Sequence, residues 1–400
     1  MATDQMYALA FQFKREKPWK QIPEADHFAA VLPDGKTGYC VLTGSQGEHL
    51  SLSVYVGEEA YQTILPLLYD QNPVTGLQEF ELFIRQDCLQ CSLESKDDVL
   101  PEIADEVRDY ARRNGFRLAG ANAFPSFLRF APARMPVPFE GGPEEEYILT
   151  ALHAALALQS GYRSGDTFSL PDNYMYLLEE QEQEDPRQIS FSAKVIPRPE
   201  WKAEYPQPAF RNDIGLAKLK KCRRTEAVQC DAIHLPAPIT DRYPPYYAAL
   251  ILCVSEADGM ILPVRMPEKA ADSTPDDLVN SLLETLLDAD CYPRKILVMN
   301  RQTQALLSSF CKKAKIRLVM EDTLEELVMA EEDLEQNLSS ANEDAADETD
   351  YLYEMIQYMM NAEDAELLKL PRELVTGILG YRKLLPEDLV RRLERLFPPN

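Results

Sequence analysis

Alternating apolar and polar residues predict a run of short strands near the start of the chain. Asp34-Gly35 between the first two strands is the typical signal of a tight hairpin turn, and a second glycine-containing turn lies at 44–47. The residues before these strands read as a polar lead. The pattern therefore predicts an antiparallel meander whose strands are Phe28 to Leu32, Gly38 to Thr43 and Leu50 to Val56.

Helical periodicity follows this meander. Val99, Ile103 and Val107 recur every four residues and share one helical face, and Asn114-Gly115 is a typical helix end. Residues 1–160 are therefore predicted to form a mixed-sheet module in the order βββαβαβα. Its later elements are a helix at 58–69, a strand region at 80–93, a helix at 97–113, a strand at 124–130 and a helix at 143–159.

The same order recurs in residues 213–335 without repetition of the sequence. Thr274 is a suitable N-cap and Pro275 suits the first helical position, so the start of one helix is well defined. Strands joined through short helices pair in parallel, which makes this sheet mixed as well. The predicted strands are 228–235, 247–254, 260–265, 295–299 and 316–320, and the predicted helices begin near 275, 301 and 322. The fold class is thus mixed α/β.

Three further segments are predicted around these modules. Residues 161–212 are rich in Pro and acidic residues and read as a connector with two strands, and 336–349 read as a flexible acidic linker. Residues 350–400 read as a helical tail. Helices this short are marginal alone in water, so we expect them to dock on the second module or on another chain. The tail residues expected to be buried are Met355, Met359, Leu374 and Leu393.

Charge changes the list of expected partners. The 400 residues carry a formal charge of −25, and 321–350 hold thirteen acidic residues with no Lys or Arg. A net charge of this size disfavours nonspecific binding to nucleic acid or anionic lipid, so neither is an expected partner. A short basic cluster opposes this excess and reads as a solvated helix end. It consists of Lys218, Lys220, Lys221, Arg223 and Arg224.

Cysteine usage and apolar runs indicate the compartment. Eight cysteines are too few for a disulfide scaffold, and Cys88 and Cys91 lie on a predicted strand, where residues three apart face opposite ways. The longest apolar run, Tyr246 to Val254, is too short to span a membrane, and Met1 to Phe13 lacks the features of an export signal. We therefore expect a cytoplasmic protein with free thiols, no membrane contact, no metal and no cofactor.

The first module contains a set of short motifs: Phe13-Lys14 with Lys17-Pro18-Trp19, Gly38-Tyr39-Cys40, Gly44 with Gly47-Glu48, Val54-Tyr55-Val56-Gly57, Gln86-Asp87-Cys88-Leu89 and Asn122-Ala123-Phe124-Pro125. Together they resemble an uncharacterised bacterial family that is defined only as a domain of unknown function. The second module, from 212 to 335, resembles another such domain that often follows it. The resemblance implies a bacterial, cytoplasmic protein and carries over no catalytic residue.

The element order of the second module is also that of ribonuclease-H-like domains, which is an analogy of fold. A nuclease of that class needs three or four carboxylates converging on two Mg²⁺ ions. The nearest candidates are Asp231, Glu284 and either Glu325 or Glu326. Asn300 stands where another acid is expected at the end of the fourth strand. The alternative function is therefore a metal-dependent nucleic-acid-processing enzyme or its degenerate relative.

A set of polar and aromatic residues in the turns of the first module forms a candidate binding pocket. The same residues fit equally well a structural role, in which their hydrogen bonds hold the turns against the sheet. The sequence favours a noncatalytic protein that acts through protein contacts or through self-association by its C-terminal helices. The candidate pocket residues are Lys17, Trp19, Glu48, Gln86, Asp87 and Asn122.

Overall fold

The computed structural model describes most of the first 338 residues and only parts of the tail. The described residues are 2–338 apart from 46–48, 70–72, 74, 139–140, 182–188, 241–242 and 269, and then 359, 364–369, 375 and 387–397. The chain divides into two compact units, 1–332 and 333–400. The first unit contains both predicted mixed-sheet modules, which confirms the fold class.

The first module is built on an eight-stranded sheet in the order β6-β5-β4-β3-β2-β1-β7-β8. Neighbouring strands are antiparallel except β1 and β7, which pair in parallel. The two strands expected inside the 161–212 connector are present as β7 and β8, and they form one edge of this sheet. The strands are β1 (Phe28–Val31), β2 (Thr37–Thr43), β3 (Leu50–Val56), β4 (Cys88–Glu94), β5 (Phe124–Phe130), β6 (Val137–Pro138), β7 (Tyr174–Gln181) and β8 (Ser190–Pro197).

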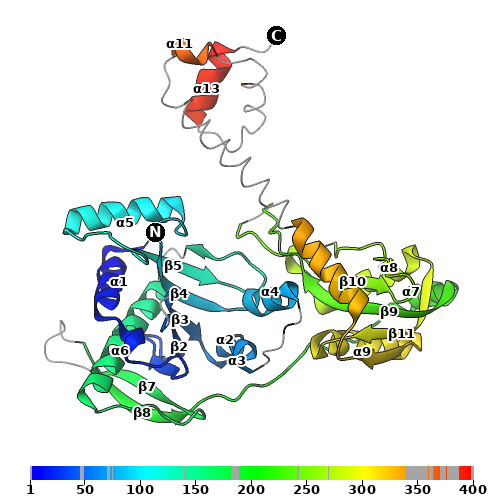
Figure 1. The fold of residues 1–400 in the computed structure, drawn as a ribbon, viewed down its shortest axis with the longest axis horizontal. Coiled ribbons are helices and arrows are strands. Elements are labelled where there is room, and N and C mark those ends of the chain that lie inside the picture. Colours follow the sequence, from blue (N-terminus) through cyan, green and yellow to red (C-terminus); the bar gives the residue numbers. More distant parts are fainter. Residues whose placement is uncertain are drawn as a thin grey trace. The chain divides into compact units, whose positions relative to one another are not determined.

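Helices cover both faces of this sheet. On one face α1 (Asp4–Glu16), the short helix η1 (Pro18–Lys20), α5 (Pro101–Asn114) and α6 (Pro143–Ser164) bury the larger core, and on the other α2 (Glu58–Gln62) and α3 (Leu65–Tyr69) bury a smaller one. The prediction of a polar lead was wrong. Helix α1 packs beside α6 on this face of the sheet (Figure 1). Its Met6, Tyr7 and Phe13 are buried in that larger core.

The predicted strand region at 80–93 was also wrong in its first half. Residues Gly76–Ile84 form helix α4, and the strand begins only at Cys88. Thr75 is the N-cap of α4, and its side chain accepts a hydrogen bond from the backbone N–H of Gln78. The helix buries Leu77, but its other end is the short apolar run Leu82-Phe83-Ile84, which resembles a buried strand, so periodicity alone did not separate the two structures.

The second module has a four-stranded sheet in the order β10-β9-β11-β12. Strand β9 is antiparallel to β10 and parallel to β11, and β11 is parallel to β12. The third predicted strand, 260–265, does not form; Ile261 only bridges Val254 of β10. The elements are α7 (Asp213–Leu219), β9 (Arg223–His234), β10 (Ala249–Ser255), the short helix η2 (Ala270–Asp272), α8 (Pro275–Asp288), β11 (Cys291–Val298), α9 (Arg301–Ala314), β12 (Arg317–Met320) and a helix at 325–338.

The tail is described in part. Two of its helices are α11 (Asp364–Leu367) and α13 (Glu387–Leu396), and Arg392 of α13 donates to the Asp364 carboxylate at 2.7 Å. Met359 and Leu393 are fully buried, as predicted, whereas Met355 and Leu374 lie outside the described residues. The predicted linker at 336–349 also lies outside them, except for 336–338, which are helical. In the described part of the chain, no helix combines the length and the apolar composition needed to cross a membrane.

Candidate functional site

The most unusual buried group of the first unit is the carboxylate of Asp231 on β9, of which 1% is exposed. Its Oδ1 accepts hydrogen bonds from Asn300 Nδ2 at 2.6 Å, Thr303 Oγ1 at 2.5 Å and the backbone N–H of Ala232 at 2.7 Å. Asn300 is the N-cap of α9, so the carboxylate also lies at the positive end of that helix. These donors explain how a carboxylate is held inside the fold.

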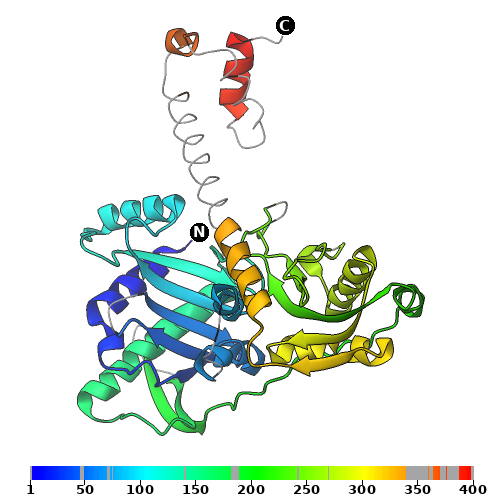
Figure 2. The same cartoon turned by 45° about the vertical axis from the view of Figure 1, so that its right-hand side comes forward.

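A second acid, Glu331, reaches the same place from the helix at 325–338. Gln229 and Asp231 are two residues apart on β9 and face the same way, while Leu327 and Glu331 are one helical turn apart. The backbone N–H of Leu327 donates to Gln229 Oε1 at 2.9 Å. The helix therefore runs along β9 in a register that places Glu331 beside Asp231, and Figure 2 shows this helix in orange against the second sheet.

The first module closes over Glu331 with the N-terminus of α4. Thr75 Oγ1 donates to Glu331 Oε2 at 2.7 Å, and Glu331 is fully buried. The other oxygen, Oε1, has no hydrogen-bond partner among the described residues. Because this buried acid neighbours Asp231, its ionisation is opposed both by loss of hydration and by the charge of Asp231.

Burial raises the pKa of both acids. Loss of hydration is the main cause for Asp231, against which its hydrogen bonds from Thr303 and Asn300 act. Loss of hydration also raises the pKa of Glu331, to about 8, and the charge of Asp231 adds to this. The pair therefore holds one proton at neutral pH. We call Asp231, Glu331, Asn300, Thr303 and Thr75 the acid corner.

Further contacts from α4 surround the acid corner. His234, at the end of β9, places Nδ1 at 2.9 and 3.0 Å from the two carboxylate oxygens of Glu81, and its backbone N–H also donates to Glu81. Arg85 Nη2 donates to Gln302 Oε1 at 3.0 Å. The two modules are thus joined by polar contacts at the carboxyl end of β9.

The acid corner does not have the composition of a metal centre. No group of three or more His, Cys, Asp or Glu side chains in the described part of the chain has metal-binding geometry. The predicted trio of Asp231, Glu284 and Glu326 is not brought together. Glu284 is exposed on α8, and the Glu326 carboxylate lies against Gly259 in the turn after β10. The neighbour of Asp231 is instead Glu331, an acid that sequence reasoning missed.

A signal for Glu331 was present in the sequence. It lies one turn after Leu327 on the buried stripe of its helix, whereas Glu326 falls outside that stripe. An acidic residue on the apolar face of a helix indicates a buried carboxylate with a nearby partner. It is a better guide than an acidic residue chosen only for its position in the order of elements.

The candidate pocket of the first module is only partly assembled. Asp87 adjoins a cavity of about 190 Å³, together with Arg129 and Glu144. Arg129 Nη2 is 2.5 Å from Asp87 Oδ1, and its Nε is 3.3 Å from Glu144 Oε1. The cation is thus already matched by two acids, which leaves little net charge to select an ionic ligand.

The other predicted pocket residues have structural roles or lie elsewhere. Gln86 accepts a hydrogen bond from the Tyr55 hydroxyl, and Trp19 is buried against Phe13 in the core. Lys17 ends α1 in the left-handed region, which Asn122 also adopts. Glu48 lies outside the described residues.

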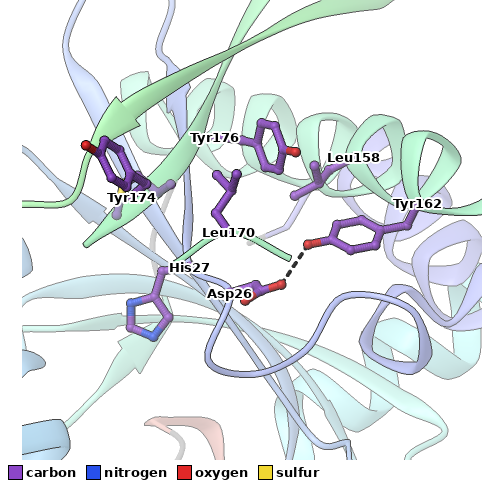
Figure 3. Close-up of a pocket in the computed structure, with 8 residues that line it drawn as sticks. Asp26, His27, Leu158, Tyr162, Leu170, Tyr174 and Tyr176 are labelled. Atoms are coloured by element: carbon purple, nitrogen blue, oxygen red, sulfur yellow. Dashed lines mark hydrogen bonds between the residues drawn. The ribbon is translucent and has the colours of Figure 1, made fainter. Parts of the chain in front are cut away.

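A second, smaller pocket adjoins His27 (Figure 3). Its volume is about 10 Å³, the space of roughly one water molecule. Tyr162 donates to Asp26 at 2.7 Å, and His27 Nδ1 lies 2.7 Å from the Tyr61 hydroxyl. Burial lowers the pKa of His27 to about 3, so the ring is neutral. These groups satisfy one another, and the pocket is too small for a substrate.

The cysteine interpretation is confirmed in its geometry. Cys88 and Cys91 of β4 contribute to the cores on opposite faces of the first sheet. All eight cysteines are free thiols, and only Cys222 is not buried. Cys222 lies between Lys221 and Arg223, inside the basic cluster, whose five cations are all exposed.

Each of the two modules matches a known family model. Residues 4–179 match the model of DUF7309, and residues 215–335 match that of DUF6930; each is a domain of unknown function. No curated protein and no solved structure matched. The chain thus carries DUF7309 followed by DUF6930, which fits an uncharacterised two-module family.

Proposed function

We propose that this protein is noncatalytic and acts through contacts with other proteins, with its two modules working as one unit. The observation that carries the proposal is the burial of Asp231 and Glu331 beneath α4. In a metal-dependent nuclease of ribonuclease-H-like order, this corner has to admit both the substrate and the metal ions. Here the first module occupies it.

The chemistry of the corner supports the same conclusion. Two-metal catalysis requires several ionised carboxylates, whereas Asn300 supplies an amide and the Asp231–Glu331 pair retains a proton. Asp231 also has three protein donors on one oxygen. These are the features of an acid pair that joins two modules.

An apolar segment after β10 supports protein contact. Four large apolar side chains lie within seven residues and are exposed: Met260 (64%), Ile261 (47%), Val264 (42%) and Met266 (40%). Clustered exposed apolar residues mark interaction surfaces more often than isolated ones do. The C-terminal helices are a second contact for a partner or another copy, and Leu368 there is 57% exposed. We also propose a cytoplasmic location in a bacterium, which the free thiols support.

Site-specific photo-crosslinking in the native host tests the protein contact. A crosslinking amino acid at position 260 or 264 should yield defined adducts with one protein species. The same amino acid at Phe168, which is 65% exposed in the first module, serves as the control. Absence of adducts from 260 and 264, or equal adducts from 168, would contradict the proposal.

A nuclease assay separates this function from the enzymatic alternative. Purified full-length protein is incubated with RNA, DNA and RNA–DNA hybrid in Mg²⁺ or Mn²⁺, beside an Asp231→Ala variant. We expect no cleavage by either protein. Cleavage by the wild type that the substitution abolishes would establish the enzyme instead.

A further inference from the structure

The second module carries a basic surface larger than the sequence cluster suggested. Strands β9, β11 and β12 are parallel, so they begin on the same side of the sheet, where the helices before them end. The C-terminal end of α9 and the start of β12 add three cations to those at the C-terminal end of α7, in the turn after it and at the start of β9. We call this surface the basic end; its residues are Lys218, Lys220, Lys221, Arg223, Arg224, Lys312, Lys315 and Arg317.

All eight cations of the basic end are exposed, and none forms a salt bridge within the described part of the chain. Nearby acids have other contacts. Asp213 is 3.8 Å from Lys313, Glu226 is 3.2 Å from Arg294, and Asp290 accepts from the backbone N–H of Arg223. Asp258 also lies beside Arg223; hydrogen bonds from Ser255 and from the backbone N–H of Met260 lower its pKa most, and the charge of Arg223 contributes least. The surface therefore retains a net positive charge.

One arginine of the basic end is held in place by an aromatic ring. The guanidinium of Arg224 lies 3.8 Å from the centre of the Tyr292 ring and donates to the Pro293 carbonyl at 3.4 Å. Positions 224 and 292 are direct neighbours across β9 and β11. A planar cation fixed at a surface suits phosphate oxygens, which it can bind through two N–H groups.

We propose that the basic end binds the phosphodiester backbone of a nucleic acid. The chain's net charge of −25 does not exclude this, because at physiological salt charges interact over about 8 Å and much of the excess lies in 321–350. Phosphates spaced along a strand match cations spread over four elements, α7, β9, α9 and β12, and the turns beside them. Only Ile214 among those elements is an exposed large hydrophobic side chain in the described residues. Protein partners usually need such anchors, which favours phosphate over an acidic protein.

This site is separate from the acid corner. It shares no residue with the apolar segment after β10, although Asp258, just before that segment, lies beside Arg223. A negative result for nucleic-acid binding would not contradict the proposed protein contact. A negative result for the protein contact would not contradict this site. It predicts binding without cleavage and without strong base preference, since backbone contacts carry no sequence information.

Binding of labelled oligonucleotides to the full-length protein tests the proposal. The probes are a mixed-sequence RNA strand and a DNA duplex, titrated from 50 to 200 mM salt, with polyglutamate as a model of an acidic protein. We expect binding of at least one nucleic acid that weakens steeply with salt. The triple variant Lys220→Ala, Lys221→Ala, Lys312→Ala should weaken it at least tenfold and reduce the salt slope by about 2.

A matched variant distinguishes this site from general charge effects. Lys20→Ala, Lys96→Ala and Arg117→Ala remove three exposed cations from the first module and should leave binding within about twofold. Cys222 supplies a second readout in the unmodified chain, because its alkylation should slow when the nucleic acid covers it. This readout does not depend on whether a variant folds.

Results of three kinds would overturn the proposal. The first is no binding of either nucleic acid by the wild type at 50 mM salt. The second is an equal loss in the two triple variants, or unchanged alkylation of Cys222 at saturating nucleic acid. The third is tighter binding of polyglutamate than of either nucleic acid, which would assign the basic end to an acidic protein.

Discussion

The two ends of β9 have opposite character. At its start, the basic end presents cations to solvent, and no salt bridge in the described structure holds them. At its other end, Asp231 is buried with Glu331 under α4, and His234 is bound by Glu81. In open α/β sheets, ligands usually bind at the carboxyl ends of the strands. Here that end is an internal contact, and the open charged surface lies at the opposite one.

The difference shows that element order alone does not locate a functional surface. The order predicted for the second module was that of ribonuclease-H-like domains, but its third strand does not form. Asp231 still stands where that analogy puts an acid. The first module changes what that acid does, because Thr75 and Glu81 come from α4. A polar group at a strand end has to be interpreted together with whatever covers it.

Among the changes considered at the two ends of β9, removal of the Asp231 carboxylate should cause the largest loss of stability. Asp231→Ala leaves Asn300, Thr303 and the Ala232 N–H without their acceptor, so we expect a loss of about 3 kcal/mol in the free energy of unfolding. Urea unfolding measures it. Glu284→Ala is the control and should change the value by less than about 0.5 kcal/mol. Equal losses in the two variants would remove the distinction between buried and exposed acids.

The dependence of stability on pH comes next in size. The folded-state pKa of Glu331 is raised from 4.5 to about 8, so its contribution to stability is complete below pH 4.5 and is lost as the pH rises through 8. Glu331→Gln should match the wild type near pH 5 and exceed it by about 2 kcal/mol at pH 9. Unfolding midpoints from pH 5 to 9 test this. Parallel curves for the two proteins would show that the acid pair holds no proton.

Loss of the Thr75 hydroxyl tests the contact from the side of the first module. Thr75→Ala removes the N-cap of α4 and the hydrogen bond to Glu331, and should destabilise the protein by about 1 kcal/mol. Thr75→Ser keeps the hydroxyl and should restore most of that loss. If serine and alanine behave alike in thermal unfolding, the hydroxyl does not join the modules.

The smallest effect on stability is expected at the basic end. Lys220→Ala combined with Lys312→Ala should change the free energy of unfolding by less than about 0.5 kcal/mol, because both side chains are exposed and outside the core. Chemical denaturation beside Asp231→Ala provides the comparison. A loss as large as that of Asp231→Ala would mean that these cations maintain the fold.

Most elements of the fold could be predicted because their signals are local. Asp34-Gly35 lies in the turn between β1 and β2, and Thr274 caps α8 through a complete capping box with Asp277. The opposite orientation of Cys88 and Cys91 on their strand could be predicted from the two-residue repeat of a strand alone. Such features depend only on neighbours in the sequence.

The candidate site could not be predicted in the same way because it depends on long-range contacts. The misassignment of Phe80 to a strand hid α4, and with it Glu81. Lys312, Lys315 and Arg317 join the earlier basic cluster only through the parallel pairing of β9, β11 and β12. No local pattern shows which distant segment will supply a donor or share a charge.

The contact between Thr75 and Glu331 has a consequence for the evolution of the two modules. Thr75 belongs to one domain and Glu331 to the other, and their hydrogen bond joins positions 256 residues apart. A chain that lost the first module would keep two adjacent acids without the helix cap that accommodates one of them. Selection in such a chain should replace Glu331 or Asp231 by a neutral residue. In chains that retain both domains, positions 75 and 331 should change together. The acid pair should therefore be found in chains that also contain the first domain.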